Sequence, residues 1–209
     1  MYQVILFDVD NTLLKTDEAV WATVEAVFNR LDIPVTKQET RQLMGLSAVE
    51  IFRKLGSPDP EQTVQDYGQE FLHHQDLVHE FSGITQLFET LRRRNVKIGI
   101  VSSKTRYGWQ TQVASYPFAK YTDQVVLAED TQQHKPNPEP LLAGMKKFPE
   151  VSRQQFLYIG DAMYDMQAAH AAGIAFGNAK WGAIPGVDFK AAEYVFETPL
   201  EVINQLYHN

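Results

Sequence analysis

Two aspartates stand one residue apart at the point where the first apolar run of the chain ends. Val4–Phe7 is apolar throughout, and Asp8 and Asp10 follow it in the stretch VILFDVDNT. Acidic residues are disfavoured in strands, so their position at the end of this run needs another explanation. Two carboxylates this close can act as a nucleophile and a general acid or base, or they can hold a metal ion. Each of these uses needs further polar groups nearby.

Such groups follow the later apolar runs. Ser102 to Lys104 follow the run that ends at Val101, and Lys135 lies beyond the next run, in the stretch HKPNPEP. Asp161 and Asp165 follow the fourth run, in GDAMYD. The carboxyl ends of parallel strands share one edge of a sheet, and ligands bind there. We therefore expect four carboxylates, at least one hydroxyl and one ammonium group to meet at one rim.

The four carboxylates predict a metal ion. Unpaired carboxylates within a few ångströms of one another repel, and some of them would take up protons. A hard divalent cation removes this repulsion, and ligands that are all oxygen atoms suit Mg²⁺. The aspartates thus lie where a metal ion and an anionic substrate can meet.

The segments that must position these groups alternate between strands and helices. Five short runs are apolar almost throughout, as buried parallel strands are: Val4–Phe7, Val96–Val101, Val125–Ala128, Phe156–Ile159 and Ile174–Phe176. Segments with helical periodicity or helix-end residues lie between them, at residues 84–94, 137–148 and 164–173. This alternation predicts an α/β fold with a doubly wound, mainly parallel, Rossmann-like sheet.

One long interval breaks the alternation. About 80 residues separate the first strand from the second, and this interval contains no convincing strand. Short helical segments fill it, with Gly45, Gly56 and the Pro58/Pro60 turn between them. We therefore predict an α/β core domain made of residues 1–15 and 81–209, and an inserted helical cap subdomain made of residues 16–80.

With these residues in place, the chain resembles the haloacid dehalogenase (HAD) superfamily of phosphohydrolases. Residues 8–12 match the first motif of that family, DxDxT, and Ser102 matches the hydroxyl of the second. Lys135 matches the lysine of the third motif, and residues 160–165 match the GDxxxD form of the fourth. The resemblance covers nearly the whole chain, because the inserted helices lie where this family carries its small helical cap.

The resemblance implies the chemistry of an Mg²⁺-dependent phosphatase. Asp8 would be the nucleophile that forms an aspartyl-phosphate, and Asp10 would protonate the leaving oxygen and then activate water. The implied metal ligands are Asp8, Asp10 through its backbone carbonyl, Asp161 and Asp165. The residues implied to bind the phosphoryl group are Ser102, Ser103 and Lys135.

Details of the motifs narrow this resemblance. True dehalogenases of the family lack an aspartate at the position of Asp10, so its presence favours phosphate chemistry. The stretches KPNPEP (135–140) and KWG (180–182) are most similar to the phosphoglycolate phosphatase and pyrophosphatase-like group, which favours a phosphoglycolate- or pyrophosphate-like substrate. Most relatives have glycine where this chain has Asn11, and asparagine tolerates the left-handed backbone expected there.

Two other functions fit the same motifs. A phosphomutase of the β-phosphoglucomutase type uses the same nucleophile, but returns the phosphoryl group to a sugar phosphate. It would need cap residues that hold the intermediate, for which Arg41, Arg53 and Lys54 are candidates. A phospho-acceptor signalling module also combines acidic residues, a hydroxyl and a lysine on an α/β sheet. The length, the DxDxT spacing and the inserted helices count against that module.

The composition excludes several other classes. The net charge of −7 argues against nucleic acid and anionic membranes as partners, and a small phosphorylated metabolite is the expected partner. The chain contains no cysteine, so disulfides and thiolate metal sites are excluded. The chain enters its first strand directly and contains no long apolar run, so we expect a cytoplasmic protein without a signal peptide. We expect it to be a monomer or a homodimer.

Overall fold

The computed structural model describes residues 1–207 of the 209-residue chain, and its centre is a six-stranded sheet. The strand order is β5-β4-β1-β6-β7-β8, and every neighbouring pair is parallel. The strands are β1 Val4–Phe7, β4 Lys97–Val101, β5 Gln124–Val126, β6 Phe156–Gly160, β7 Ala175–Ala179 and β8 Tyr194–Phe196. The predicted doubly wound α/β fold is confirmed.

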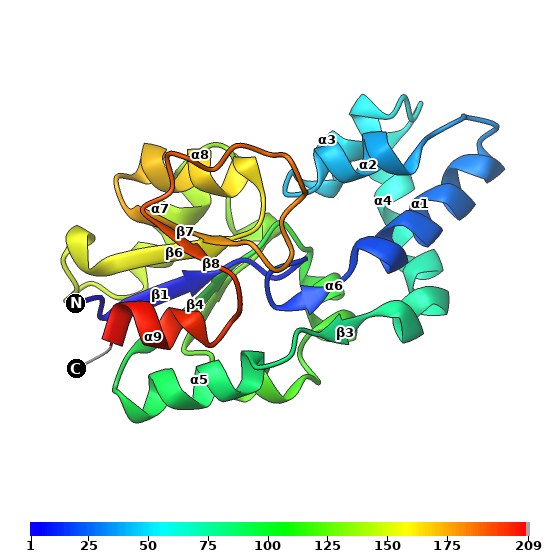
Figure 1. Ribbon diagram of the computed structural model, residues 1–209. Helices are drawn as coiled ribbons and strands as arrows, with labels where there is room; N and C mark the ends of the chain where they lie inside the picture. Colours follow the sequence, from blue (N-terminus) through cyan, green and yellow to red (C-terminus); the bar gives the residue numbers. More distant parts are fainter. Residues whose placement is uncertain (208–209) are drawn as a thin grey trace.

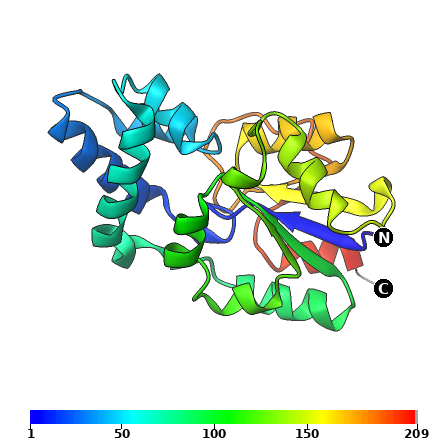
Figure 2. The same ribbon diagram turned by 180° about the vertical axis from the view of Figure 1, so that it is seen from behind.

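Helices cover both faces of this sheet, which explains why its central strands are mainly apolar. In β1, Ile5 and Phe7 belong to one hydrophobic cluster, and Val4 and Leu6 to another. The first cluster includes side chains of α5 (Ile84–Arg93) and α9 (Glu201–Tyr207), and the second includes side chains of α7 (Glu139–Lys146) and α8 (Met163–Ala172). Figures 1 and 2 show these two helix pairs on opposite sides of the strands.

The interval after the first strand is helical, as predicted. It contains α1 Asp17–Arg30, α2 Lys37–Leu43, α3 Ala48–Lys54, α4 Pro60–Phe71 and the 3₁₀ helix η1 Leu72–Leu77. Figure 1 shows α1 to α4 beyond the carboxyl ends of the strands. Thr36 forms a capping box at the start of α2, and the Asp59 side chain caps α4. The helices α2 and α4 therefore begin where their capping residues satisfy free backbone N–H groups.

The sequence interpretation missed three short strands. Leu14–Lys15 (β2) and His79–Glu80 (β3) form an antiparallel pair at the two ends of the helical interval, and β8 is a three-residue edge strand. Runs of two or three residues are too short to produce a recognisable periodicity. The β2–β3 pair lies where the sequence predicts the cap boundaries, at residues 15/16 and 80/81.

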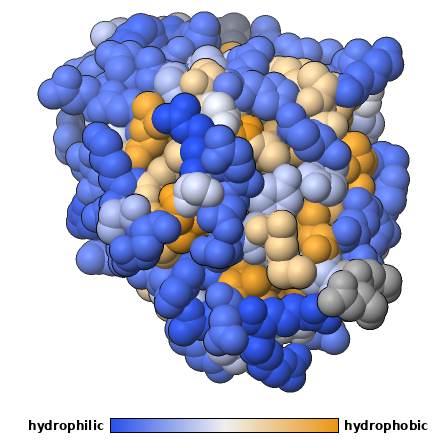
Figure 3. Space-filling model, turned by 90° about the vertical axis from the view of Figure 1, so that its left-hand side faces the viewer, coloured by the Kyte–Doolittle hydropathy of each residue, from blue (hydrophilic) through white to orange (hydrophobic). Residues whose placement is uncertain are grey.

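The remaining helices connect the strands. They are α6 Arg106–Gln112 and the 3₁₀ helices η2 Pro117–Tyr121, η3 Ala128–Asp130 and η4 Arg153–Gln155. Among residues 1–207, no helix combines the length and apolar character needed to cross a bilayer. Figure 3 views the end of the molecule that is on the left of Figure 1, and this face is mainly hydrophilic with apolar residues in small groups. The opposite end, where the strands meet α1 to α4, contains the site described next.

Candidate active site

The predicted nucleophile Asp8 lies at the centre of the sheet edge. It follows β1, whose neighbours are β4 and β6, and its backbone N–H donates to Ile159 O over 2.9 Å. This bond continues the ladder with β6 by one residue, so the Asp8 carboxylate is held by regular strand geometry. The side chain is almost fully buried. Residues that follow β4 and β6 can therefore reach it from either side.

A tight turn follows Asp8. Asn11 has the left-handed backbone expected at this position, with φ of 53°. The Trp181 indole N–H donates to Thr12 O over 2.9 Å, and a Cβ atom at Gly182 would overlap Asn11 O. The KWG stretch thus packs directly on the turn that carries the aspartates, and only glycine fits at its last position.

Lys135 is the cation of the site and is completely enclosed. Its Nζ donates to Asp8 Oδ1 at 2.8 Å, to Asp165 Oδ1 at 2.7 Å and to the Tyr158 hydroxyl at 3.0 Å. These three acceptors use all three ammonium hydrogens. The Tyr158 hydroxyl also lies 3.0 Å from Val101 O and 3.1 Å from Asp165 Oδ1. A buried charge is stable only when it is paired and hydrogen-bonded in this way.

The site carries more negative charge than Lys135 neutralises. Burial raises the pKa of Asp8 to about 7; the charges of Asp165 and Asp10 add to the shift, and that of Lys135 opposes it. Burial, together with the charges of Asp165 and Asp8, also raises the pKa of Asp161 well above its usual range. Burial alone would lower the pKa of Lys135, but the carboxylates of Asp165 and Asp8 raise it. The negative charge of these carboxylates is therefore not fully balanced by Lys135.

The donor atoms fit a hard divalent cation. Asp8, Asp161 and Asp165 each offer a carboxylate oxygen, and these oxygens lie within 4.8 Å of one another. An excess of negative charge on oxygen ligands is the environment that Mg²⁺ prefers. Asp161 Oδ1 also accepts a hydrogen bond from the Thr12 hydroxyl over 3.2 Å. The carboxylate of Asp10 is outside this group, so its predicted role through the backbone carbonyl stays a prediction.

The three aspartates differ in how many of their oxygen lone pairs remain free of hydrogen bonds and so available to a metal ion. Asp165 Oδ1 accepts from Lys135, and its Oδ2 accepts from the Ala162 N–H over 3.0 Å. The predicted metal ligand Asp165 is therefore already engaged in holding Lys135 and the start of α8. Asp8 and Asp161 have fewer partners and offer the more accessible oxygens.

Asp10 faces a different group of residues. Lys104 Nζ lies 3.0 Å from Asp10 Oδ1, and it donates to Gln112 Oε1 over 2.8 Å. The Lys104 side chain is only 9% exposed. Tyr158, Thr12 and Gln112 were not assigned to the site. For Tyr158 the sequence does contain a signal of a site role: it is a tyrosine inside an otherwise apolar buried strand, and its hydroxyl needs a hydrogen-bond partner.

The two predicted serines have different surroundings. Ser102 Oγ is buried and accepts from the Lys104 N–H over 3.3 Å, which leaves its hydroxyl hydrogen to donate elsewhere. Ser103 Oγ donates to Gly45 O over 3.0 Å and so ties the loop between α2 and α3 to the sheet edge. The assignment of both serines to the substrate stays a prediction.

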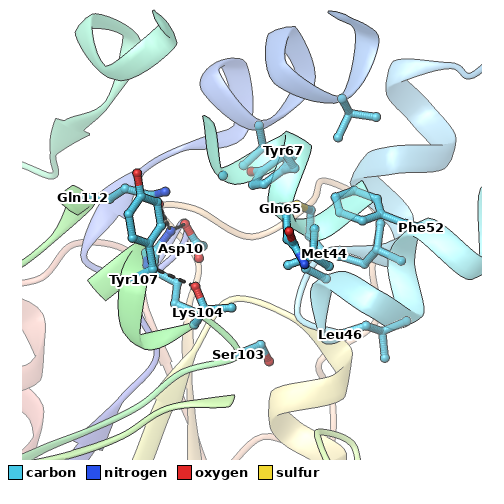
Figure 4. A pocket seen from close by; sticks show the side chains of 18 of the residues that line it. Asp10, Met44, Leu46, Phe52, Gln65, Tyr67, Ser103, Lys104, Tyr107 and Gln112 are labelled. Carbon is cyan, nitrogen blue, oxygen red and sulfur yellow. Dashed lines mark hydrogen bonds and ion pairs between the residues drawn. The ribbon is translucent and has the colours of Figure 1, made fainter. Parts of the chain in front are cut away.

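A cavity of about 560 Å³ opens above these groups. It extends from Asp8 and Asp10 to residues of α1, α3 and α4. Figure 4 shows Asp10, Lys104 and Gln112 on one side of it, and Met44, Leu46 and Phe52 on the other. The site thus has a charged end on the sheet and an apolar wall on the helices.

Comparisons with known proteins agree with this geometry. A family model described as "Haloacid dehalogenase-like hydrolase" matches residues 5–179. A "putative pyrophosphatase PpaX" from Clostridium perfringens is 28% identical over 98% of this chain and 97% of its own length. A pyrophosphatase PpaX from Oceanobacillus iheyensis is 25% identical over 85% of this chain and 83% of its own. The crystal structure of a "putative phosphoglycolate phosphatase" from Lactobacillus plantarum superimposes with a TM-score of 0.90 at 30% identity, covering 98% of this chain and 99% of that one.

Proposed function

The chain belongs to the haloacid dehalogenase-like hydrolase family, and from this premise we propose that it is an Mg²⁺-dependent phosphatase of a small phosphorylated metabolite. In this proposal, residues 1–15 and 81–209 form the catalytic core and residues 16–80 the cap. The observation that carries the proposal is the buried group formed by Asp8, Lys135, Asp161 and Asp165.

The first step transfers the phosphoryl group to Asp8. An Asp8 carboxylate oxygen forms a bond to phosphorus while the bond from phosphorus to the leaving oxygen breaks. Asp10, as a carboxylic acid, gives its proton to that oxygen. Asp8 and Asp10 both line the cavity.

The second step releases phosphate. Asp10, now a carboxylate, takes a proton from a water molecule, and the oxygen of that water attacks the phosphorus of the aspartyl-phosphate. The bond from phosphorus to Asp8 breaks, which yields inorganic phosphate and restores the Asp8 carboxylate. Lys135, 2.8 Å from Asp8, balances negative charge on the nucleophile during both steps.

Ser102 and the metal complete the electrostatics of this proposal. In the proposal the Ser102 hydroxyl, at the end of β4, donates to a phosphoryl oxygen, and Ser103 is the second candidate. Mg²⁺, when held by Asp8, Asp161, the Asp10 backbone carbonyl and Asp165, supplies positive charge that favours the ionised form of Asp8 and offsets the charge of the phosphoryl group. Phosphoryl transfer depends mainly on positioning and electrostatic stabilisation, so no further cofactor is required.

The test is phosphate release from a panel of phosphate esters with Mg²⁺ and with EDTA. The panel contains phosphoglycolate and pyrophosphate, which the names of the relatives suggest, together with sugar phosphates and nucleotides. We expect metal-dependent turnover that is lost in Asp8→Asn. An isomerised sugar phosphate without free phosphate would instead identify a phosphomutase. A stable phospho-Asp8 formed from acyl phosphates, without turnover of any ester, would identify a phospho-acceptor module.

The cytoplasmic location and the monomeric or homodimeric state belong to the same proposal. Cell fractionation tests the first, and size-exclusion chromatography with light scattering tests the second.

A further inference from the structure

The wall of the cavity opposite the aspartates is largely apolar, although Gln65 of α4 also lies on it (Figure 4). It is made by side chains of four elements, namely α1, the loop between α2 and α3, α3 and α4. Its apolar side chains include Val24, Met44, Leu46, Ile51 and Phe52. In Figure 4 Met44, Leu46 and Phe52 lie together on this side of the cavity, across from Asp10 and Lys104. A leaving group that departs from Asp8 toward the helices therefore contacts mainly carbon atoms.

The charged residues that line the cavity do not favour an anionic leaving group. Four of them are acidic, namely Asp8, Asp10, Asp66 and Glu129. Within residues 1–207, Lys104 is the one cation of the lining, and it already pairs with Asp10 and Gln112. A carboxylate or second phosphate enclosed here would lose water without gaining a counter-ion, which is strongly unfavourable.

The basic residues of the helices are directed elsewhere. The interval between β2 and β3 contains Arg30, Lys37, Arg41, Arg53 and Lys54, and none of these five lines the cavity. Four of them form ion pairs with acidic residues, namely Arg30 with Glu70, Lys37 with Glu18, Arg41 with Asp17 and Arg53 with Glu61. The two cap arginines that a phosphomutase could have used, Arg41 and Arg53, are thus paired outside the cavity.

The loop that carries part of the wall is fixed against the sheet edge. Gly45 O accepts the hydrogen bond from Ser103, and a Cβ atom at Gly45 would lie 2.9 Å from the Ala162 Cβ. Because Gly45 has φ of +98°, it also allows a backbone turn that other residues rarely adopt. Met44 and Leu46, on either side of it, are consequently held over the site.

From these observations we propose that the natural substrate is a phosphate monoester of an uncharged alcohol. The apolar part of this alcohol packs against the helical wall of the cavity. The inference rests on the proposed phosphatase function and narrows its substrate class. The cavity volume of about 560 Å³ is within the range of about 300–1,000 Å³ typical of sites for drug-sized molecules. Glycolate and a second phosphate are smaller than this space and carry the charge that its wall does not compensate.

The test is a series of n-alkyl phosphates measured on the wild-type enzyme with Mg²⁺. Ethyl, butyl and hexyl phosphate release alcohols of nearly equal basicity, so differences in kcat/KM report contact with the cavity. Burial of a CH₂ group contributes about 0.8 kcal/mol, which corresponds to about a fourfold rise in kcat/KM per added carbon. Phosphoglycolate is the charged counterpart of ethyl phosphate, and we expect ethyl phosphate to exceed it by about tenfold or more.

The possible outcomes separate the two proposals. A rising alkyl series with phosphoglycolate and pyrophosphate below it supports the inference. A flat series, or a higher kcat/KM for phosphoglycolate or pyrophosphate, overturns the inference and leaves the phosphatase function standing. No phosphate from any ester, charged or apolar, overturns the phosphatase function and the inference together.

A matched pair of variants supplies a second measurement. Met44→Lys adds a cation to the apolar wall, and we expect it to shift the ratio of kcat/KM for phosphoglycolate over butyl phosphate upward by about tenfold or more. Gln42→Lys adds the same charge two residues away, outside this cavity, and should leave the ratio unchanged. An equal shift in both variants, or no shift in Met44→Lys, contradicts the assigned wall.

Discussion

The two ends of the cavity are built in opposite ways. At the sheet, Asp8, Lys135 and Asp165 are almost fully buried, and each charge has a partner within 2.8 Å. At the helices, side chains such as Met44 and Phe52 come from separate elements and make no directional bonds. A buried charge tolerates almost no displacement, whereas an apolar wall tolerates changes of shape. The comparison suggests that chemistry is fixed at one end and selectivity is adjustable at the other.

The largest effect should come from removing the nucleophile. Asp8→Asn keeps the shape of the side chain but cannot form the aspartyl-phosphate, and we expect kcat to fall by about 10⁴-fold or more. Phosphate release with the best ester of the panel measures this. The melting temperature should stay close to that of wild type, which would show that the loss is chemical. Activity that persists within tenfold would mean that another group attacks phosphorus.

Replacement of the buried lysine should affect stability as well as activity. Lys135→Met leaves Asp8 and Asp165 without their cation, and we expect the free energy of unfolding to fall by about 3–5 kcal/mol. Urea unfolding in EDTA measures this without compensation from a metal ion.

A double variant sharpens this result. Lys135→Met combined with Asp165→Asn removes one of the two uncompensated charges, so part of the lost stability should return. If the double variant is less stable than Lys135→Met alone, the loss of the 2.7 Å ion pair between Lys135 and Asp165 does not explain the lower stability of Lys135→Met. A comparable substitution on the helical wall, Ile51→Val, should cost only about 0.5–1.5 kcal/mol.

The charged end could be predicted from the sequence because strand ends determine its positions. Once β1, β4 and β6 are recognised as parallel neighbours, the residues that follow them must share one edge. Lys135 reaches the same edge through the connection that follows β5, and its match to the third motif of the family supports that prediction. The left-handed turn at Asn11 was also predicted, and its φ of 53° confirms that expectation.

The apolar wall could not be predicted, because its geometry is not local. Val24, Met44 and Phe52 come from three elements, and only the packing of the short helices brings them to one cavity. Their spacing in the sequence is that of ordinary amphipathic helices, which gives no sign of a ligand. The pairing of Lys104 with Asp10 and Gln112 could not be predicted for the same reason, since it depends on how α6 packs.

The pH dependence of metal binding tests the charged end of the cavity. We expect a moderate effect on stability. The folded-state pKa of Asp8 is raised to about 7 and that of Asp161 is also raised, so the folded protein without metal binds protons that the unfolded chain has lost. Its stability therefore falls as the pH rises from about 4 to about 7. Mg²⁺ competes with these protons, so its stabilising effect should grow over the same interval.

Thermal unfolding with Mg²⁺ and with EDTA at pH 5.5 and pH 8 measures this difference. At a concentration of one hundred times the dissociation constant, a bound ion contributes about 2.7 kcal/mol, and we expect an effect of this size only at pH 8. Asp161→Asn should remove most of it. An equal stabilisation at both pH values would mean that Mg²⁺ binds away from these carboxylates.

The smallest effect should arise where the two ends of the cavity meet. Ser103→Ala removes the hydrogen bond to Gly45 O, which contributes about 0.5–1.5 kcal/mol, and so loosens the loop that carries Met44 and Leu46. If Ser103 acts only on this loop, KM for hexyl phosphate should rise by a few-fold while kcat for ethyl phosphate stays the same. If Ser103 instead donates to the phosphoryl group, kcat should fall by a similar factor for every ester. Ser103→Thr, which keeps a hydroxyl, should restore the wild-type values in either case, so the split between kcat and KM decides to which end of the cavity this residue belongs.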